Sequence, residues 1–318
     1  MRIKVIQDII DKIRGKKKTP IQIDWTDKEK YVENIKQSFK DCYGYDLDLE
    51  NPKTLSEKMM WLRVYDNTPL KTKCADKYAV REYIKEKIGE EYLIPLLGVY
   101  DNFGDIDFDK LPNQFVMKCN HGCGYNIIVK DKSAFNKEEA KTKINTWLSE
   151  DFSAKFGEIH YSPIKRKIII EQYIENLDGE IQDYKYFCFN GKPYYILYCT
   201  NRKSGILKNS FFDLTFKNMQ FHYCGELFTK ELEPPQNLNL MTEIAEKLCK
   251  EFKHVRVDLY NIEGKIYFGE LTFTGYGGYY NFNPPEWNIK LGELLDINTP
   301  QTLVGVERER ESSFSNGI

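Results

Sequence analysis

The sequence lacks a long apolar run, and it lacks an excess of charge of either sign. No stretch of its 318 residues approaches the roughly 20 consecutive apolar residues of a membrane span, and no segment has the pattern of a signal peptide. Lysine and arginine number 46 and aspartate and glutamate 48, so the formal charge is −2. Because there is no basic excess, we expect no nucleic-acid partner.

Cysteine, histidine and glycine occur without the patterns that mark several large protein classes. The eight cysteines are scattered, and there are only four histidines. Scattered cysteines favour reduced thiols, and therefore a cytoplasmic protein rather than a disulfide-bonded one. We find no Ser-His-Asp or Cys-His set for nucleophilic catalysis. The phosphate-binding motifs G-x-x-x-x-G-K-[ST] and G-x-G-x-x-G are also absent.

The most informative stretch spans residues 255–278 and has the pattern of a β-hairpin followed by a glycine-rich bend. Apolar and polar residues alternate over 255–260, as in a strand with one buried face. Turn-forming residues occupy 261–265, and a second β-rich run covers 266–274. Alternate residues of this second run should share one face, namely Ile266, Phe268, Glu270 and Thr272. The glycines of the bend are Gly275, Gly277 and Gly278.

The expected turn fixes which side chains face each other across this hairpin. With that loop, Arg256 lies across from Glu270. Asp258 then lies across from Phe268, so that one face carries an arginine, two carboxylates and the Thr272 hydroxyl at the same end. Such charges can form simple cross-strand ion pairs on a surface. Alternatively, two hard oxygen donors among apolar residues suit a magnesium ion held together with a nucleotide phosphate.

A second candidate site begins at Lys118. Apolar residues alternate along 115–119, so Lys118 should point away from the core face of a strand. A loop with Gly122 and Gly124 follows, and then a strand over 125–130. A lysine that leads into a glycine-bearing loop suits nucleotide phosphates, because the ammonium pairs with phosphate oxygens while backbone N–H groups close over them.

Polar residues also interrupt the next two strands. An apolar strand over 167–174 ends in a polar segment that contains Glu175 and Asp178. The following strand starts at Asp183, and its period of two places Asp183 and Lys185 on one face. Polar side chains thus lie on both sides of a predicted hinge.

Three acids alternate over residues 105–109. They could form the metal-binding Asp-x-Asp of a sugar-nucleotide transferase, but that pattern is too short to be specific. We favour a solvated loop before Leu111-Pro112 and keep a glycosyltransferase that uses these acids as an alternative function.

The two ends of the chain differ in pattern from its middle. Residues 1–18 predict a basic amphipathic helix, because isoleucines recur at helical spacing among lysines and arginines. Such a helix can lie on an anionic membrane surface or dock on its own protein, and both interpretations stay open. The expected location is therefore the cytoplasm, with contact to the inner membrane face as one alternative. Residues 298–318 show no period and predict a flexible tail.

The order of these features resembles the ATP-grasp superfamily, and within it the TupA-like family found with teichuronopeptide and cell-surface polysaccharide biosynthesis. The resemblance covers residues 53–296. The segments that carry it are LSEKMMWLRVYD, DKYAVREYI, YLIPLLGVYD, LPNQFVMKCNHGCGYNII, DYKYFCFNGKPYY and VRVDLYNIEGKIYFGELTFTGYGG.

The resemblance implies an α+β ATP-grasp fold and a division of the chain. A helix-rich N-terminal subdomain would cover residues 1–110, and a first lobe with the phosphate loop would cover 111–174. A second lobe with the metal site would cover 175–297, with ATP clasped between the two lobes. The tail at 298–318 would follow the second lobe.

The same resemblance implies which residues contact the phosphates of ATP. Lys118 and Lys185 would do so, with Asp183 orienting the second lysine. The loop after Lys118 would close over the phosphates, through Asn120, His121, Gly122 and Gly124.

The other end of ATP would lie where the predicted strand 167–174 ends. By resemblance, Glu171 and the backbone of Gln172 to Ile174 would hold the adenine. Either Glu175 or Asp178 would bind the ribose, and the choice stays open.

The hairpin residues would hold the metal and stabilise the reaction. Asp258 and Glu270 would bind Mg²⁺, and Arg256 is similar to the arginine that stabilises the acyl intermediate. Lys185 is the other expected catalytic residue. The wider superfamily usually has asparagine where this chain has Thr272, so the third ligand and the number of metals stay open.

The implied function is an ATP-dependent carboxylate–amine ligase. The substrate carboxylate would form an acylphosphate, and an amine would then displace phosphate to give an amide. The expected partners are a uronic acid carboxylate of a cell-surface glycan and an amine or amino acid. A glycosyltransferase and a non-catalytic ATP-binding scaffold are the alternatives.

Overall fold

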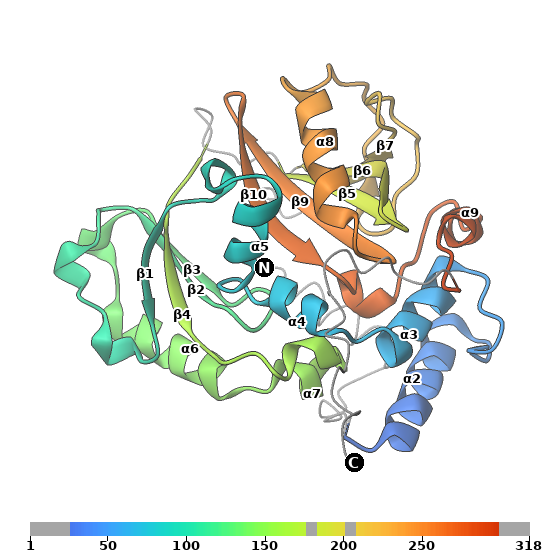
Figure 1. Ribbon diagram of the computed structural model, residues 1–318, viewed down its shortest axis with the longest axis horizontal. Coiled ribbons are helices and arrows are strands. Elements are labelled where there is room, and N and C mark those ends of the chain that lie inside the picture. Colours follow the sequence, from blue (N-terminus) through green and yellow to red (C-terminus); the bar gives the residue numbers. More distant parts are fainter. Residues whose placement is uncertain (1–25, 176–182, 201–207, 299–318) are drawn as a thin grey trace, which may run out of the picture.

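The computed structural model describes residues 26–175, 183–200 and 208–298, which form two sheets surrounded by helices (Figure 1). The helices are α2 (Lys28–Tyr43), α3 (Leu55–Tyr65), α4 (Pro69–Ala75), α5 (Val80–Lys87), α6 (Lys137–Ser149), α7 (Phe152–Phe156), α8 (Leu238–Cys249) and α9 (Trp287–Leu294). The strands are β1 (Leu96–Tyr100), β2 (Phe115–Cys119), β3 (Asn126–Val129), β4 (Ile168–Gln172), β5 (Asp183–Phe189), β6 (Lys192–Thr200), β7 (Lys208–Phe212), β8 (Glu226–Leu227), β9 (His254–Ile262) and β10 (Lys265–Thr272). The α+β fold class expected from the sequence is confirmed.

Local sequence sets the ends of the first helices. The Asp27 carboxylate caps α2 by accepting a hydrogen bond from the Lys30 amide at 3.1 Å, and Gly44 ends the helix with a φ of +78°. Thr54 and Glu57 form a capping box at the start of α3. Helix α3 then packs against α9 (Figure 1).

The first sheet has four antiparallel strands in the order β1-β4-β2-β3. On β2, the buried side chains of Phe115, Met117 and Cys119 belong to a core shared with α6. Lys118 lies on the opposite, half-buried face, as the alternation predicted. Strand β1 lies within the range 1–110, which we expected to be helix-rich, and it joins this sheet by pairing with β4.

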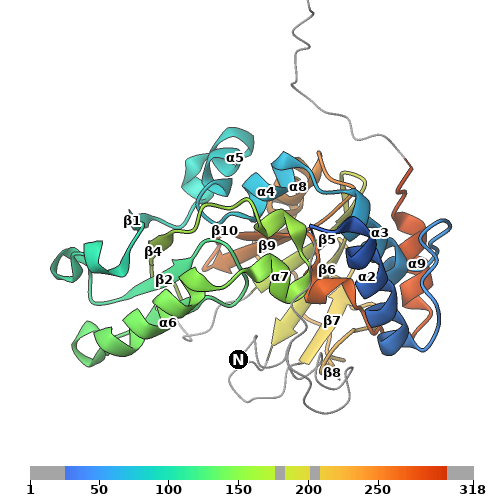
Figure 2. The same ribbon diagram turned by 90° about the horizontal axis from the view of Figure 1, so that it is seen from below.

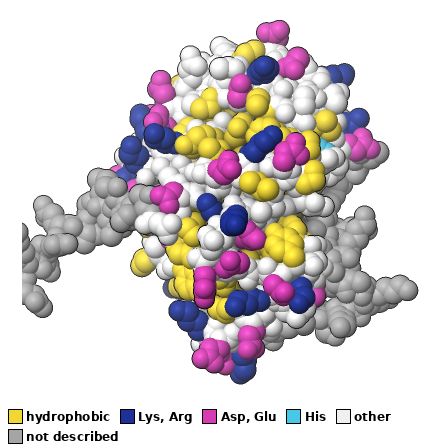
Figure 3. Space-filling view, turned by 90° about the vertical axis from the view of Figure 1, so that its right-hand side faces the viewer, with side chains coloured by type: hydrophobic (Ala, Val, Ile, Leu, Met, Phe, Trp, Pro, Cys, Tyr) yellow, Lys and Arg dark blue, Asp and Glu magenta, His cyan; other side chains and the backbone are white. Residues whose placement is uncertain are grey.

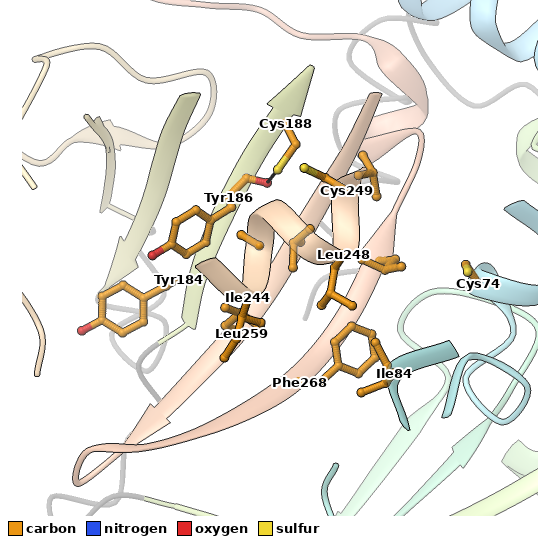
Figure 4. Close-up of a cluster of buried hydrophobic side chains, with 14 of the residues drawn as sticks. Cys74, Ile84, Tyr184, Tyr186, Cys188, Ile244, Leu248, Cys249, Leu259 and Phe268 are labelled. Carbon is orange, nitrogen blue, oxygen red and sulfur yellow. Dashed lines mark hydrogen bonds between the residues drawn. The ribbon is translucent and has the colours of Figure 1, made fainter. Parts of the chain in front are cut away.

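The second sheet has six strands in the order β10-β9-β5-β6-β7-β8, and only its last pair is parallel among the described strands. Helix α8 covers one face, where Ile244 lies over Leu259 of β9 (Figure 4). On the opposite face, Phe187 shares a core with α2, α3 and α9. Further along that face, Lys185 and Asp258 lie opposite each other on β5 and β9. This face is therefore apolar where helices cover it and charged at its other end.

The two sheets meet at helices α4 and α5 (Figures 1 and 2). Helix α4 contacts β10 of the second sheet, and α5 contacts α8. Figure 2 shows α6 and α7 together on one side of the molecule, away from α8. Cys74 and Ala75 of α4 and Val80 of α5 belong to the same apolar core as α8, so this segment packs on the α8 face of the second sheet.

The central hairpin has a shorter turn than the sequence predicted. Strands β9 and β10 are joined by Glu263-Gly264, and the two residues have φ of 49° and 83°. Two-residue turns with this backbone match the right-handed twist of the strands. The Asn261 side chain accepts a hydrogen bond from the Gly264 amide at 3.0 Å. The loop expected at 261–265 is therefore wrong by three residues, since Asn261, Ile262 and Lys265 belong to the strands.

The register of the hairpin also corrects the prediction. Arg256 pairs with Thr272 rather than with Glu270. Asp258 pairs with Glu270 rather than with Phe268. Both predicted pairs are wrong because the turn is shorter than expected and because the register shifts at a β-bulge between Phe268 and Glu270.

The bulge changes which side chains of β10 share a face. Ile266 and Phe268 are buried in the core beneath α8. Glu270 and Thr272 lie on the other face, where both contact the Arg256 guanidinium. The predicted common face of these four β10 residues is therefore wrong, because one extra residue inverts the alternation of a strand.

The surface over α3 and α9 carries hydrophobic side chains with charged ones among them (Figure 3). The large apolar side chains exposed in this part of the chain include Tyr65 and Ile289. Mixed surfaces of this kind are ordinary for folded proteins.

Among the described residues, no helix has the length and apolar character needed to cross a membrane. The basic helix predicted for residues 1–18 lies outside the described residues. The same holds for the predicted tail, apart from Asn298.

Candidate active site

A pocket of about 170 Å³ lies between the two sheets. Strands β2 and β4 form one wall, β10 forms the opposite wall, and the junction of α4 and α5 forms a third side. The charged side chains that line it are Lys77, Arg81, Lys118, Glu171 and Glu270. The pocket thus brings together candidate residues from the strand lysine, the apolar strand and the hairpin.

Lys118 and Glu171 form an ion pair on the first-sheet wall. The Lys118 ammonium donates to Oε2 of Glu171, and Arg81 Nη1 lies 3.3 Å from Oε1 of the same carboxylate. Glu171 therefore uses both carboxylate oxygens for cations. The residues that resemblance assigns to the phosphates and to the adenine are in direct contact.

The first part of the expected phosphate loop is anchored to the protein. The buried Asn120 amide donates to the Asp76 carboxylate at 2.8 Å and to the Lys165 carbonyl at 3.0 Å. His121 is also buried, and its Nε2 lies 3.0 Å from the Trp147 carbonyl oxygen. Burial lowers the pKa of this imidazole below its ordinary value. Asn120 and His121 therefore bind protein groups and do not line the pocket.

The second part of the loop reaches the pocket. Gly124 lines it together with Cys123 and Tyr125, whereas Gly122 does not. The carbonyl of Gly122 accepts a hydrogen bond from the Lys77 ammonium. Lys77 itself lines the pocket, so one side chain both holds the loop and contributes positive charge to the site.

The chain that follows β4 forms another part of the wall. Gln172 and Ile174 line the pocket, and their place beside the adenine stays a prediction. Glu175 does not line it, and its carboxylate pairs with Lys130 at 2.8 Å. Asp178, the other candidate for the ribose, lies outside the described residues.

Arg256 lies at the centre of a charged network behind the β10 wall. Its Nε donates to Asp258 Oδ1 at 2.6 Å, and its Nη2 donates to Oδ2 at 2.8 Å. The same Nη2 lies 3.2 Å from Glu270 Oε1 and 3.0 Å from the Thr272 hydroxyl. Although burial alone would lower the pKa of Arg256, the Asp258 carboxylate raises it well above its ordinary value. The guanidinium is therefore always charged.

Lys185 extends this network along β5. Its ammonium bonds Asp258 Oδ2 and lies 2.7 Å from Asp183 Oδ2. All three side chains are buried. Asp183 thus contacts the Lys185 ammonium directly, and its orienting role stays a prediction.

The hairpin residues fit a divalent cation by their donor chemistry. The network contains three carboxylates against two cations, a formal charge of −1, and Glu270 is its member at the pocket wall. Asp258 binds both Arg256 and Lys185, and Glu270 and Thr272 each contact Arg256. Of these residues Glu270 lines the pocket, whereas Lys185, Arg256, Asp258 and Thr272 do not. Within the described ranges, no three His, Cys, Asp or Glu side chains converge as a ready metal site. A cation here would therefore share its coordination with oxygen atoms of a ligand.

Sequence reasoning missed two cations that line the pocket, Lys77 and Arg81. Lys77 lies in the turn between α4 and α5, and Arg81 lies four residues later in the first turn of α5. Within a continuous helix such a spacing would put two side chains on one face. That spacing was the available signal. It could not by itself identify the strand that the pair faces.

The acids at 105–109 lie away from this pocket. The Asp107 carboxylate accepts a hydrogen bond from the Asp109 amide at 3.2 Å and pairs with Lys110 at 3.1 Å. Asp105, Asp107 and Asp109 are all exposed, and none of them lines the pocket. These local contacts support a solvated loop.

A family model identifies the class of this fold. The model described as TupA-like ATPgrasp matches residues 57–296, about three quarters of the chain. The chain has an ATP-grasp fold. It belongs to the TupA-like ATP-grasp family, and the resemblance stated from the sequence is confirmed. No curated protein sequence matches the chain significantly.

Several solved structures are similar to part of the chain at low sequence identity. The L-amino acid ligase from Bacillus licheniformis is 15% identical, with a TM-score of 0.46, over 85% of this chain and 62% of its own. The D-alanine–D-alanine ligase from Bacillus anthracis complexed with ATP is 19% identical, with a TM-score of 0.38, over 63% and 53%. The D-alanine–D-alanine ligase from Helicobacter pylori is 18% identical, with a TM-score of 0.42, over 70% of this chain and 61% of its own. The chain thus spans about half to three fifths of their lengths.

Proposed function

We propose that this protein is an ATP-dependent carboxylate–amine ligase that binds ATP and Mg²⁺ in the pocket between its sheets. The observation that carries the proposal is the presence of two charged clusters across one pocket. Lys118 and Glu171 lie on the first-sheet wall, and Glu270 lies on the opposite wall in front of Arg256 and Lys185. Membership of an ATP-grasp family supports a nucleotide as the ligand.

The two lysines supply positive charge for the phosphates. The Lys118 side chain is 22% exposed and lines the pocket, so its ammonium can contact a ligand through a change of side-chain rotamer. Lys185 is buried between Asp183 and Asp258 and would act from behind the β10 wall. Pairs between an ammonium and a phosphate are strong charge-assisted hydrogen bonds.

The base would lie beside the end of β4. That strand ends at Gln172, so the backbone from Tyr173 onward is outside the sheet ladder and able to meet a ligand edge. Apolar side chains there suit the faces of a purine ring, and they include Val80, Leu93, Val116, Ile174 and Leu271. Glu171 would face the adenine, and either Glu175 or Asp178 would meet the ribose.

The reaction we propose has two steps. A carboxylate oxygen of the first substrate attacks the γ-phosphorus of ATP, the bond to the β,γ-bridging oxygen breaks, and ADP leaves. The amine nitrogen of the second substrate then attacks the acyl carbon of the acylphosphate, phosphate leaves, and the nitrogen loses a proton. The protein mainly positions the substrates and stabilises charge. Arg256, which borders Gly275 of the glycine turn, would stabilise the oxyanion of the second step.

Magnesium, when bound, would neutralise the phosphate charge during transfer. Glu270 would hold it at the pocket wall, with Thr272 and Asp258 behind Glu270. The network around Arg256 has a formal charge of −1, and this negative charge favours the binding of a divalent cation.

The substrates form the finer part of the proposal. We propose a uronic acid of a cell-surface polysaccharide as the carboxylate donor and an amino acid or other amine as the acceptor. The family resemblance supports this choice of substrates. None of the eight cysteines forms a disulfide, which supports action in the reducing cytoplasm. Contact with the inner membrane face through residues 1–18 remains part of the proposal.

Trapping of the acylphosphate tests the chemistry. Purified protein would be incubated with ATP, Mg²⁺, hydroxylamine and a panel of oligosaccharides that carry glucuronate or galacturonate. We expect ADP and a sugar hydroxamate in equal amounts, and neither product with Lys118→Met. Consumption of a UDP-sugar without ATP would contradict the ligase and favour the glycosyltransferase.

A further inference from the structure

We infer that Arg81 sets the base specificity of the pocket. It holds Glu171 in place, so that one oxygen of this carboxylate is available to the 6-amino group of adenine while Lys118 serves the phosphates. The inference rests on the proposed function, because it takes ATP to be the ligand.

The geometry that carries this inference is a triad of side chains on the pocket wall. Arg81 comes from the first turn of α5, and Glu171 comes from β4, 90 residues further along the chain. Arg81 Nη1 lies 3.3 Å from Glu171 Oε1, while the Lys118 ammonium bonds Oε2. The Arg81 and Glu171 side chains are 17% and 9% exposed, so solvent screens their attraction only in part.

The charge of the triad explains why two cations are needed. Glu171 is buried, and a buried carboxylate without a cation is strongly unfavourable. If Lys118 were its only partner, Lys118 could move to a phosphate only by leaving that charge uncompensated. Arg81 removes this conflict, because it continues to pair with Oε1 after Lys118 has released Oε2.

The released oxygen is chemically selective. An ionised carboxylate only accepts hydrogen bonds, so Oε2 of Glu171 can accept from an amino group and repels a carbonyl oxygen. Adenine carries an amino group at C6, whereas hypoxanthine and guanine carry an oxygen there. Without Arg81, Glu171 would either stay on Lys118 or take up a proton, and the selective acceptor would be lost.

Arg81 is thus a positioning residue, and its contribution differs from that of Lys118. Loss of Lys118 should weaken all purine nucleoside triphosphates alike, because every one of them carries the same phosphates. Loss of Arg81 should mainly weaken nucleotides that carry the 6-amino group. The affinity for a nucleotide with the 6-amino group, divided by the affinity for one without it, therefore distinguishes the role of Arg81 from that of Lys118.

Calorimetric titration with ATP and with purine riboside 5′-triphosphate, which has only hydrogen at C6, tests the inference. The titrations use Mg²⁺ and no carboxylate substrate. We expect wild type to prefer ATP by about tenfold or more, the usual scale for a hydrogen bond to a charged group. Arg81→Met should bring the ratio close to one. Arg81→Lys should restore part of the preference, and it keeps the test valid if the methionine variant fails to fold.

Two control variants separate the role of Arg81 from a general loss of nucleotide binding. Lys118→Met should weaken both ligands and keep their ratio. Arg166→Met removes an exposed arginine whose Nη1 donates to the Leu148 carbonyl at 2.7 Å, outside the pocket, and should change neither affinity. A wild-type ratio in Arg81→Met, whether or not both nucleotides bind more weakly, would overturn the assignment of Arg81. Wild-type protein that binds neither nucleotide would instead overturn the proposed function.

Discussion

Single side chains in the Arg256 network have separable tasks, because they differ in burial and in number of partners. Arg256 and Asp258 are buried and bind each other through two hydrogen bonds. Glu270 shares one contact with the same guanidinium, and its side chain is 26% exposed at the pocket wall. A change at Glu270 should therefore affect the pocket more than the fold, whereas a change at Arg256 should affect both.

Glu270→Gln should lower the rate of ADP formation by about a hundredfold, the scale on which one positioned electrostatic group acts. The amide keeps the shape of the side chain and removes the charge that would attract Mg²⁺. Turnover at saturating Mg²⁺ measures the effect. Asp107→Asn is the control, because that carboxylate serves a local turn outside the pocket. Equal activity of wild type and Glu270→Gln would remove Glu270 from the site.

Arg256→Met should destabilise the protein by about 3 kcal/mol, the lower end of the scale for removing one partner of a buried ion pair. Asp258 would keep only Lys185. Lys118→Met should cost less than about 1 kcal/mol, because Lys118 is part-exposed and Glu171 keeps Arg81. Urea unfolding of the two variants measures the difference. If the two variants lost the same free energy of unfolding, the Arg256 network would not stabilise the fold more than the Lys118–Glu171 pair does.

At the scale of residues, the sequence predicted the members of the hairpin network but not all of the pocket. Alternation placed Arg256 and Asp258 on one face because strands have a period of two. Nothing local connects Arg81 to Glu171, since their contact depends on how α5 packs between the sheets. Contacts of this kind follow from the tertiary fold and carry no short sequence signal.

Among the structural elements, the hairpin β9–β10 shows how one glycine redirects a strand. Its existence followed from alternation and turn residues, but its register did not. Gly269 interrupts the β10 pattern, and a glycine inside a strand often marks a bulge. This bulge turns Glu270 and Thr272 toward Arg256 while Ile266 and Phe268 stay in the core.

Gly269→Ala should destabilise the protein by about 1–3 kcal/mol, the usual range for overpacking. A Cβ at this position would lie 2.9 Å from the Asp258 carbonyl oxygen and 3.2 Å from the Tyr260 ring. The midpoint of urea unfolding measures the loss. Gly104→Ala is the matched control, since nothing lies within 4 Å of its Cβ position. If both variants lost the same stability, close packing at the bulge would not be the cause.

Across the whole molecule, buried histidines link stability to pH. Burial lowers the pKa of His160 and of His254 to about 3, far below the ordinary 6.5. Both groups are therefore neutral when folded but take up protons when unfolded below pH 6.5. Their contribution to stability is present above pH 6.5 and is lost as the pH falls. Glu158 acts with the opposite sign, because burial raises its pKa to about 7 and stability is lost from pH 4.5 to 7.

The free energy of unfolding should therefore decrease between pH 6.5 and 5. Each histidine contributes a loss of about 1.4 kcal/mol per pH unit, and Glu158 offsets one such contribution. These three groups give a net loss of about 1.4 kcal/mol per unit. His121, whose pKa is also lowered by burial, adds a loss of the same sign. Glu158→Gln should make the loss steeper by removing the offset. Urea unfolding at pH 7, 6 and 5 measures both slopes, and a flat profile in wild type would contradict neutral buried histidines.

The overall architecture was predictable from the order of its elements, but the closure of the pocket was not. Separate strand patterns and the family resemblance led to an α+β fold of two lobes. The third side of the pocket comes from the α4–α5 junction near Lys77, within a range assigned only to a helix-rich subdomain. The division of the chain into that subdomain and two lobes remains a proposal.

The central claim is that the pocket between the sheets binds ATP for ligation, and nucleotide selection tests it most directly. Calorimetric titration of the purified protein would compare ATP with UDP-glucose, each with and without Mg²⁺. We predict binding of ATP that strengthens with Mg²⁺, weakens about tenfold or more in Lys118→Met, and exceeds the binding of UDP-glucose. Tighter binding of UDP-glucose than of ATP, unchanged in Lys118→Met, would contradict the account.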